Sequence, residues 1–145
     1  MKIRVETAAR LHLGFVDLHG GLGRRFGSVG VGLKRPRLIL EVEPAAELTS
    51  EGPGAERAFE FATCFHESFA SRGEGSLATA HVRVVEAIPP HVGLGSGTQL
   101  ALAVGTALAR LNNLDVGAAD LALAMGRGRR SRMGIGSFEG GGFMV

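Results

Sequence analysis

Glycine is concentrated in three stretches of the chain, and this distribution constrains the fold more than any other feature of the sequence. The chain has 23 glycines in 145 residues, well above the usual share of roughly 7%. Most of them lie within Gly14–Gly32, Gly93–Gly97 and Gly126–Gly142, without a fixed period. A collagen-like or low-complexity chain would repeat or spread its glycine. The sequence therefore predicts a globular chain with three glycine-rich loop regions.

The rest of the composition is that of one ordinary domain. A hydrophobic content of 45% and a charged content of 21% are typical of globular folds. No apolar run reaches the roughly 18 residues of a membrane helix, and the alternating first residues lack the apolar stretch of a signal peptide. Because Cys64 is the single cysteine, an intrachain disulfide and a thiolate metal cluster are excluded. We expect a cytoplasmic protein without membrane contact.

The charges favour a small anionic ligand over nucleic acid. A net charge of +2 is too small to indicate a nucleic-acid binder, and the absence of Trp and Tyr removes the usual stacking platforms. Arginine greatly outnumbers lysine, which a GC-rich genome alone would explain. Guanidinium groups also bind phosphate and carboxylate in two-point fashion. A candidate anion site is therefore the cluster of Arg127, Arg129, Arg130 and Arg132.

Apolar residues alternate with polar ones in the first third of the chain, which predicts an antiparallel meander or a similar sheet. The alternating segments are Ile3–Thr7, Leu11–Phe15, Val29–Leu33 and Leu38–Val42. In the third segment the other face carries only Gly30 and Gly32. Glycine at such positions indicates that backbone or a ligand approaches closely.

Helical spacing of apolar residues predicts three helices, over residues 56–69, 96–111 and 116–125. We expect Asp115 to cap the third helix. Between the first two helices, residues 80–88 alternate as a strand, which Pro89 and Pro90 end.

The last residues, 143–145, are typical of the beginning of a strand and carry no polar tail. We therefore expect a chain cut inside its fold, or a fragment of a longer one. Such a chain would expose a sheet edge and an apolar face that need a partner.

The segment Pro89–Thr98, with the sequence PPHVGLGSGT, lies between a predicted strand and a predicted helix. Glycine lets backbone N–H groups approach an anion, and the first N–H groups of a helix have no intrahelical acceptor. Ser96 and Thr98 add hydroxyls for phosphate oxygens or a bound metal, and His91 lies close enough in sequence to reach a bound phosphate. The segment is neither a Walker P-loop nor a G-x-G-x-x-G fingerprint. A phosphate loop and a purely structural glycine turn both remain open.

This segment resembles a known phosphate-binding motif. Pro-Pro-x-x-Gly-Leu-Gly-Ser, before a helix rich in Ala and Leu, resembles the motif of the GHMP superfamily (galacto-, homoserine, mevalonate and phosphomevalonate kinases). The continuation Gly97-Thr98-Gln99 is similar to a non-kinase branch, the β-ribofuranosylaminobenzene 5′-phosphate synthases of methanopterin biosynthesis. The segments Ala9–Leu18, Gly126–Gly136 and Phe138–Phe143 resemble the same branch. The resemblance covers the whole chain but only about the N-terminal half of the family's length.

The resemblance implies an α+β fold, a GHMP-kinase-like N-terminal domain with a mixed, largely antiparallel sheet and helices packed on one face, apparently truncated. Residues 1–145 would form this domain, with the second, C-terminal domain absent. A homodimer or a missing C-terminal half is the expected partner.

Three positions depart from the kinases of the superfamily. Arg10 aligns with their usual lysine, Gly136 with the catalytic aspartate that many of them carry, and Gly97 with a serine. A missing carboxylate leaves no group to accept a proton from a substrate hydroxyl. All three differences argue against phosphoryl transfer from ATP.

For the synthase branch, the resemblance implies that 5-phosphoribosyl diphosphate and 4-aminobenzoate, or a close analogue, give a C-riboside, carbon dioxide and pyrophosphate. We expect the diphosphate on Gly93, Leu94, Gly95, Ser96, Gly97 and Thr98, with Mg²⁺ at Ser96 and Thr98. Arg10, Asp17 and His91 are the candidate catalytic residues, and Arg129 and Arg130 the candidate substrate-binding residues.

Two alternatives are kept: a small-molecule kinase that uses ATP, and a partial, inactive domain that only binds phosphate.

Overall fold

The structure, a computed structural model, describes residues 1–21, 23, 27–127 and 133–144, and it has an α+β fold. The elements run in the order β1 (Ile3–Asp17), β2 (Gly27–Pro44), β3 (Thr49–Glu51), α1 (Ala55–Ala70), β4 (Ala80–Glu86), α2 (Ser96–Leu111), α3 (Ala118–Ala124), α4 (Met133–Glu139) and β5 (Phe143–Met144). The predicted helices over residues 56–69 and 96–111 are confirmed almost to the residue.

The strands form one mixed, largely antiparallel sheet, as expected. Its order is β1-β2-β4-β3, and β5 pairs with β2. Only the pairing of the short strand β3 with β4 is parallel. The four alternating segments are not four strands, however, because they merge in pairs into the long strands β1 and β2, which form one antiparallel ribbon.

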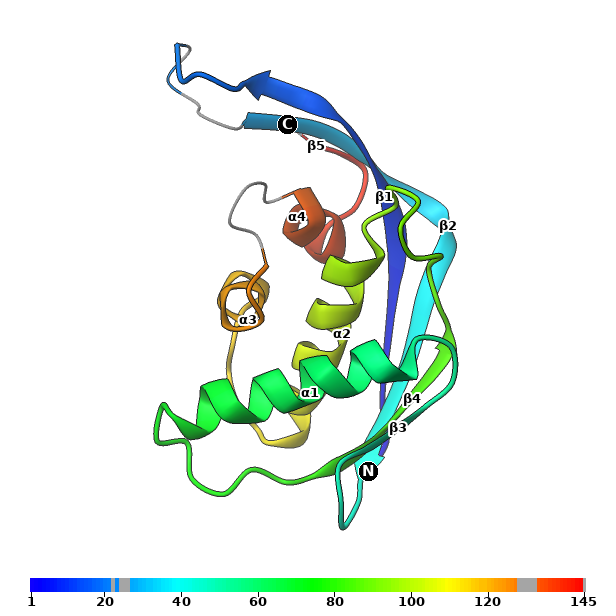
Figure 1. The fold of residues 1–145 in the computed structure, drawn as a ribbon, viewed down its shortest axis with the longest axis vertical. Helices are drawn as coiled ribbons and strands as arrows, with labels where there is room; N and C mark the ends of the chain where they lie inside the picture. Colours follow the sequence, from blue (N-terminus) through cyan, green and yellow to red (C-terminus); the bar gives the residue numbers. More distant parts are fainter. Residues whose placement is uncertain (22, 24–26, 128–132, 145) are drawn as a thin grey trace.

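The helices all cover the same face of this sheet (Figure 1). Helix α2 lies at the centre and contacts the sheet and the other three helices, and most of its residues are buried. Helix α1 buries Ala58, Ala62, Phe65 and Phe69, the stripe that its spacing predicts, and the two Phe rings stack with centroids 4.5 Å apart. Each buried side chain of this size stabilises the fold by about 1.5–3 kcal/mol.

The register between β1 and β2 shifts at Ala9, where Ala8 pairs with Arg37 but Arg10 already pairs with Gly32. Because of this shift, Ala9 is fully buried and Arg10, the next residue, is also turned toward the helices. Leu11 therefore turns away from the helices and is exposed. A second shift, between His12 and Gly14, pairs Phe15 with Ser28, on the same face as Gly30. Leu13 and Phe15 are also exposed.

The glycine face of β2 meets α4 and the segment after it, which confirms the close approach expected there. A Cβ on Gly30 would lie 2.5 Å from Sδ of Met133 in α4, and one on Gly32 would lie 3.1 Å from Cα of Gly141. The N–H of Gly32 donates to the carbonyl of Gly142 over 2.7 Å. The small size of glycine lets α4 and the segment after it lie this close to the sheet.

The predicted start of the third helix was wrong. Helix α3 begins at Ala118, its N-cap is Gly117, and no side chain caps it. Asp115 therefore lies before the helix. None of the described helices combines the length and apolar character needed to cross a membrane.

Candidate phosphate-binding site

The loop that leads from β4 into α2 presents unpaired backbone donors. Gly93 and Gly95 have φ angles of 77° and 78°, in the left-handed region that favours glycine. Gly95 is the N-cap of α2 and, being glycine, has no side chain to cap the helix. Its carbonyl accepts a hydrogen bond from the N–H of Gln99 over 3.1 Å. The N–H groups of Ser96, Gly97 and Thr98 therefore have no intrahelical acceptor, and the helix dipole adds positive potential there.

Arg10 lies against this loop, because the register shift of β1 turns it inward. Its N–H donates to the carbonyl of Leu94 over 3.1 Å, and a Cβ on Gly95 would lie 3.0 Å from its Cγ and Nε. The Nε atom is buried and has no hydrogen-bond partner in the structure. Burial lowers the pKa of the Arg10 guanidinium, since desolvation disfavours the charged form.

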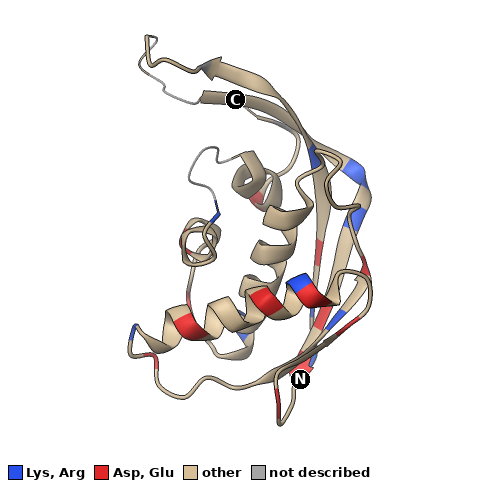
Figure 2. Ribbon diagram, in the orientation of Figure 1, with Lys and Arg blue, Asp and Glu red and all other residues tan. Residues whose placement is uncertain are grey.

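Two further guanidinium groups meet at Gly97, one from α1 and one from the segment after α3. A Cβ on Gly97 would lie 2.6 Å from Nη2 of Arg57 and 3.2 Å from Nη2 of Arg127. The Arg127 guanidinium also lies over the ring of Phe61, 5.2 Å from its centroid. Basic positions on β1, near the beginning of α1 and directly after α3 are visible in Figure 2.

The sequence interpretation missed Arg57. One local signal was available: it is a cation in the first turn of a helix, where the helix dipole favours anions. Among the residues that the structure describes, no carboxylate forms an ion pair with Arg10, Arg57 or Arg127. These three cations are therefore available to an anion.

The first turn of α2 is fixed in place by a fully buried glutamine. Gln99 hydrogen-bonds through Oε1 to the hydroxyl of Thr7 in β1, and its Nε2 donates to the carbonyl of Gly134 in α4 over 2.8 Å. Gly134 in turn packs on Thr98, since a Cβ there would lie 2.6 Å from Cγ2 of Thr98. Sheet, loop and α4 are thus held together where the anion donors lie.

The other predicted site residues are placed as follows. Ser96, Gly97 and Thr98 are partly exposed in the first turn of α2. His91 is exposed in the loop with a φ of 61°. Asp17 ends β1, where its backbone pairs with Gly27, and its side chain lies outside what the structure describes. Arg129 and Arg130 lie outside the described residues.

An apolar pocket of about 290 Å³ opens beside the loop. Its polar side chains are those of Arg57 and Ser96, and the remaining lining residues are apolar or glycine. They are Leu38, Pro53, Gly54, Ala87, Ile88, Pro89, Pro90 and Leu100.

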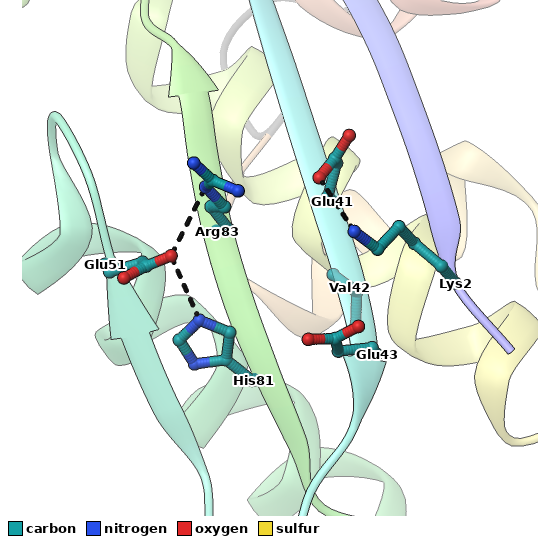
Figure 3. A pocket seen from close by; sticks show the side chains of 7 residues that line it. All are labelled: Lys2, Glu41, Val42, Glu43, Glu51, His81 and Arg83. Carbon is teal, nitrogen blue, oxygen red and sulfur yellow. Dashed lines mark hydrogen bonds and ion pairs between the residues drawn. The ribbon is translucent and has the colours of Figure 1, made fainter.

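A smaller hollow of about 70 Å³ lies on the other face of the sheet (Figure 3). There Oε1 of Glu51 accepts from Arg83 over 3.3 Å and lies 3.4 Å from Nε2 of His81, and Lys2 pairs with Glu41 over 3.3 Å. Because most of these charges pair with one another, we interpret this hollow as a surface ion-pair network.

A comparison with protein families agrees with the geometry. The model of the N-terminal domain of GHMP kinases matches residues 57–141, which include most of α1, all of α2 and the loop between β4 and α2. The chain belongs to this family.

Within the GHMP family, the chain is similar to three curated relatives named beta-ribofuranosylphenol 5'-phosphate synthase. The protein of Methanothermobacter thermautotrophicus is 37% identical over 151 residues, and that of Archaeoglobus fulgidus is 35% identical over 144 residues. The alignments cover 100% and 99% of this chain but only 46% and 44% of those proteins. The chain therefore spans less than half the length of the relatives it matches.

Solved structures of GHMP proteins share the fold. Phosphomevalonate kinase of Streptococcus pneumoniae superimposes with a TM-score of 0.70 at 17% identity, over 97% of this chain and 47% of that one. A 4-(cytidine 5'-diphospho)-2C-methyl-D-erythritol kinase gives a TM-score of 0.64 at 23% identity, over 88% of this chain and 47% of that one. At these identities the likeness shows the fold alone.

Proposed function

We propose that this chain is the phosphate-binding N-terminal domain of a pentosyltransferase that joins 5-phosphoribosyl diphosphate to a 4-substituted benzoate. The observation that carries the proposal is the convergence of Arg10, Arg57 and Arg127 on the unpaired N–H groups at the start of α2. The curated relatives, which are named as synthases of a ribofuranosylphenol phosphate, support it. Their name makes 4-hydroxybenzoate, the hydroxyl analogue of 4-aminobenzoate, the first acceptor to test.

In this reaction the bond between C1 of the ribose and the diphosphate oxygen breaks, and pyrophosphate leaves with the electron pair. The ring carbon that bears the carboxylate bonds to C1, and its bond to the carboxylate then breaks to release carbon dioxide. Negative charge grows on the leaving group, so fixed donors aimed at that group would supply most of the rate enhancement. Residues 93–98 with the three arginines are suited to this role.

The first turn of α2 also fits a magnesium ion that arrives bound to the diphosphate. Mg²⁺ in such sites takes few protein ligands and several phosphate oxygens. Ser96 and Thr98 carry partly exposed hydroxyls there, and the described residues contain no cluster of carboxylates or histidines that would bind the ion without substrate. When bound, the ion would neutralise charge on the departing pyrophosphate.

His91 and Asp17 belong to this proposal as groups on the substrate side, and Arg129 and Arg130 as further anion ligands. A second part of the active site, from a C-terminal half or from another copy of the chain, completes it.

The test is an assay with phosphoribosyl diphosphate and 4-hydroxybenzoate or 4-aminobenzoate, in the presence of Mg²⁺ and the absence of ATP. We expect release of carbon dioxide and pyrophosphate in equal amounts. Phosphorylation that requires ATP would instead support the kinase alternative. No turnover, together with a melting temperature that rises with pyrophosphate, would identify a domain that only binds phosphate.

A further inference from the structure

The apolar pocket beside the phosphate loop lies next to a cation that has no anion of its own. Arg57 both lines this pocket and contacts Gly97 at the loop. It forms no ion pair with a carboxylate of the described residues. An open apolar pocket with one charged group at its edge suits a ligand that has an apolar body and a single opposite charge.

We infer that this pocket is the subsite for the aromatic acid, with the ring between Leu38, Ile88 and Leu100 and its carboxylate at Arg57. The inference rests on the proposed pentosyl transfer and adds the place of the acceptor. A volume of about 290 Å³ lies just below the roughly 300–1,000 Å³ typical of small-molecule sites, which suits a single substituted ring. A guanidinium fork binds a carboxylate by two parallel hydrogen bonds.

This placement orients the acceptor for the reaction. With the carboxylate at Arg57, the ring carbon that bears it is the ring atom nearest the loop, where the diphosphate would lie. The 4-substituent points into the apolar end of the pocket. The carbon that must bond to C1 of the ribose is therefore the one presented to it.

Arg57 can also stabilise negative charge on two different groups in the course of the reaction. The carboxylate loses its charge as carbon dioxide forms, while pyrophosphate gains charge as it leaves. Because Arg57 lies between the pocket and Gly97, its guanidinium can turn from one group to the other. A cation that only held the carboxylate would oppose its departure, since it would stabilise the ground state more than the transition state.

The experiment measures binding of 4-hydroxybenzoate and of pyrophosphate separately, by ligand-observed NMR or calorimetry on the 145-residue chain. Ala87→Phe adds bulk to the pocket wall and is expected to weaken benzoate binding at least tenfold while leaving pyrophosphate binding within about twofold. Arg127→Gln alters the loop but not the pocket lining. It is expected to weaken pyrophosphate binding at least tenfold while leaving benzoate binding within about twofold. Arg57→Gln is expected to weaken both, and it covers the case in which Ala87→Phe does not fold.

Several results would overturn the subsite. The first is that 4-hydroxybenzoate does not bind when pyrophosphate is present. The second is that Ala87→Phe or Arg57→Gln leaves benzoate binding unchanged. The third is that adenosine displaces the ligand from the pocket, which would identify a nucleoside site. The subsite and the proposed function can fail separately. If the enzyme turns over but neither variant changes benzoate binding, the subsite alone is refuted. If benzoate binds in the pocket but no carbon dioxide is released when phosphoribosyl diphosphate is added, the proposed function is refuted.

Discussion

Arg10 is a half-buried cation that forms no ion pair with a carboxylate of the described residues. Its pKa is lowered by burial, and its Nε has no partner in the structure. An anion on the phosphate loop would remove this penalty, so the residue's benefit comes with binding and not with folding. Replacing such a residue is expected to lower the affinity for an anion without lowering the stability of the free chain.

The variant Arg10→Met tests that separation. We expect pyrophosphate affinity to fall about tenfold or more, because a hydrogen bond to a charged group contributes about 1.5–3 kcal/mol. The melting temperature of the free chain should stay the same or rise. Arg37→Met is the control, since Arg37 pairs with Glu6 and Glu86 away from the loop. A large loss of stability in Arg10→Met would show that the residue is structural.

Gly97 keeps space for two guanidinium groups. In Gly97→Ala the new Cβ would meet Nη2 of Arg57 at 2.6 Å, and a flexible side chain would move away. We expect weaker pyrophosphate binding with an unchanged or higher melting temperature, because alanine is favoured over glycine in a helix by about 1 kcal/mol. Gly117→Ala, where a Cβ meets open space, should leave affinity unchanged. Equal affinity in Gly97→Ala and the wild type would contradict this role.

His66 is expected to make stability depend on pH. Burial lowers the pKa of His66 from 6.5, and Nε2 is buried without a hydrogen-bond partner. Between its folded and unfolded pKa values the unfolded state binds more protons, so stability is lost as the pH falls through about 6.5. Melting curves from about pH 8 to about pH 5 should show a smaller decrease for His66→Leu than for the wild type. Parallel curves for the two proteins would refute the assignment.

At the scale of elements, β1, α2 and α4 meet at one buried side chain, Gln99. Its two hydrogen bonds to Thr7 and Gly134 cross from the sheet to both helices. Buried polar groups of this kind are costly when a partner is lost, because water cannot replace it.

Gln99→Met should lower the free energy of unfolding by about 1–3 kcal/mol, since it leaves the buried Thr7 hydroxyl without its partner and removes the hydrogen bond to the Gly134 carbonyl. Urea unfolding measures the change. The double variant Thr7→Val with Gln99→Met also removes the hydroxyl left without a partner, so its loss is expected to be smaller than the sum of the single losses. Simple additivity would mean that the two side chains do not interact.

The elements differ in how far sequence alone predicts them. Helices α1 and α2 follow from the spacing of their apolar residues, and the loop between β4 and α2 follows from its glycines. The outward turn of Leu11 and Leu13 depends on the register between β1 and β2, which alternation within one strand does not reveal. The place of Arg57 depends on how α1 packs beside α2, so a sequence interpretation leaves it as an ordinary surface residue.

At the scale of the whole molecule, the later part of β1 exposes large apolar side chains. Leu13 is 60% exposed, Leu11, Phe15 and Val16 are also exposed, and Leu18, directly after the strand, is 60% exposed. Exposed apolar side chains in such numbers favour association with other apolar surfaces. The far end of the ribbon formed by β1 and β2 extends past the helices (Figure 1).

The double variant Leu11→Lys with Leu13→Lys should therefore bind less of a hydrophobic dye and sediment with less dependence on concentration. Its melting temperature should change little, because both side chains are exposed. Lys at the two positions also adds charge repulsion between copies. Unchanged dye binding and sedimentation would show that these side chains do not govern association.

The register shift at Ala9 makes the anion site sensitive to the length of β1 as well as to its composition. Replacing Ala9 changes one buried contact, whereas deleting it moves every later residue of the strand by one place in the pleat. Leu11 would then occupy the position of Arg10 beside Gly95, and Arg10 would move to the fully buried position of Ala9, one place further from the loop. A gap at this point in an alignment of related chains therefore marks those in which the loop after β4 no longer faces a cation, even if every glycine of that loop is present.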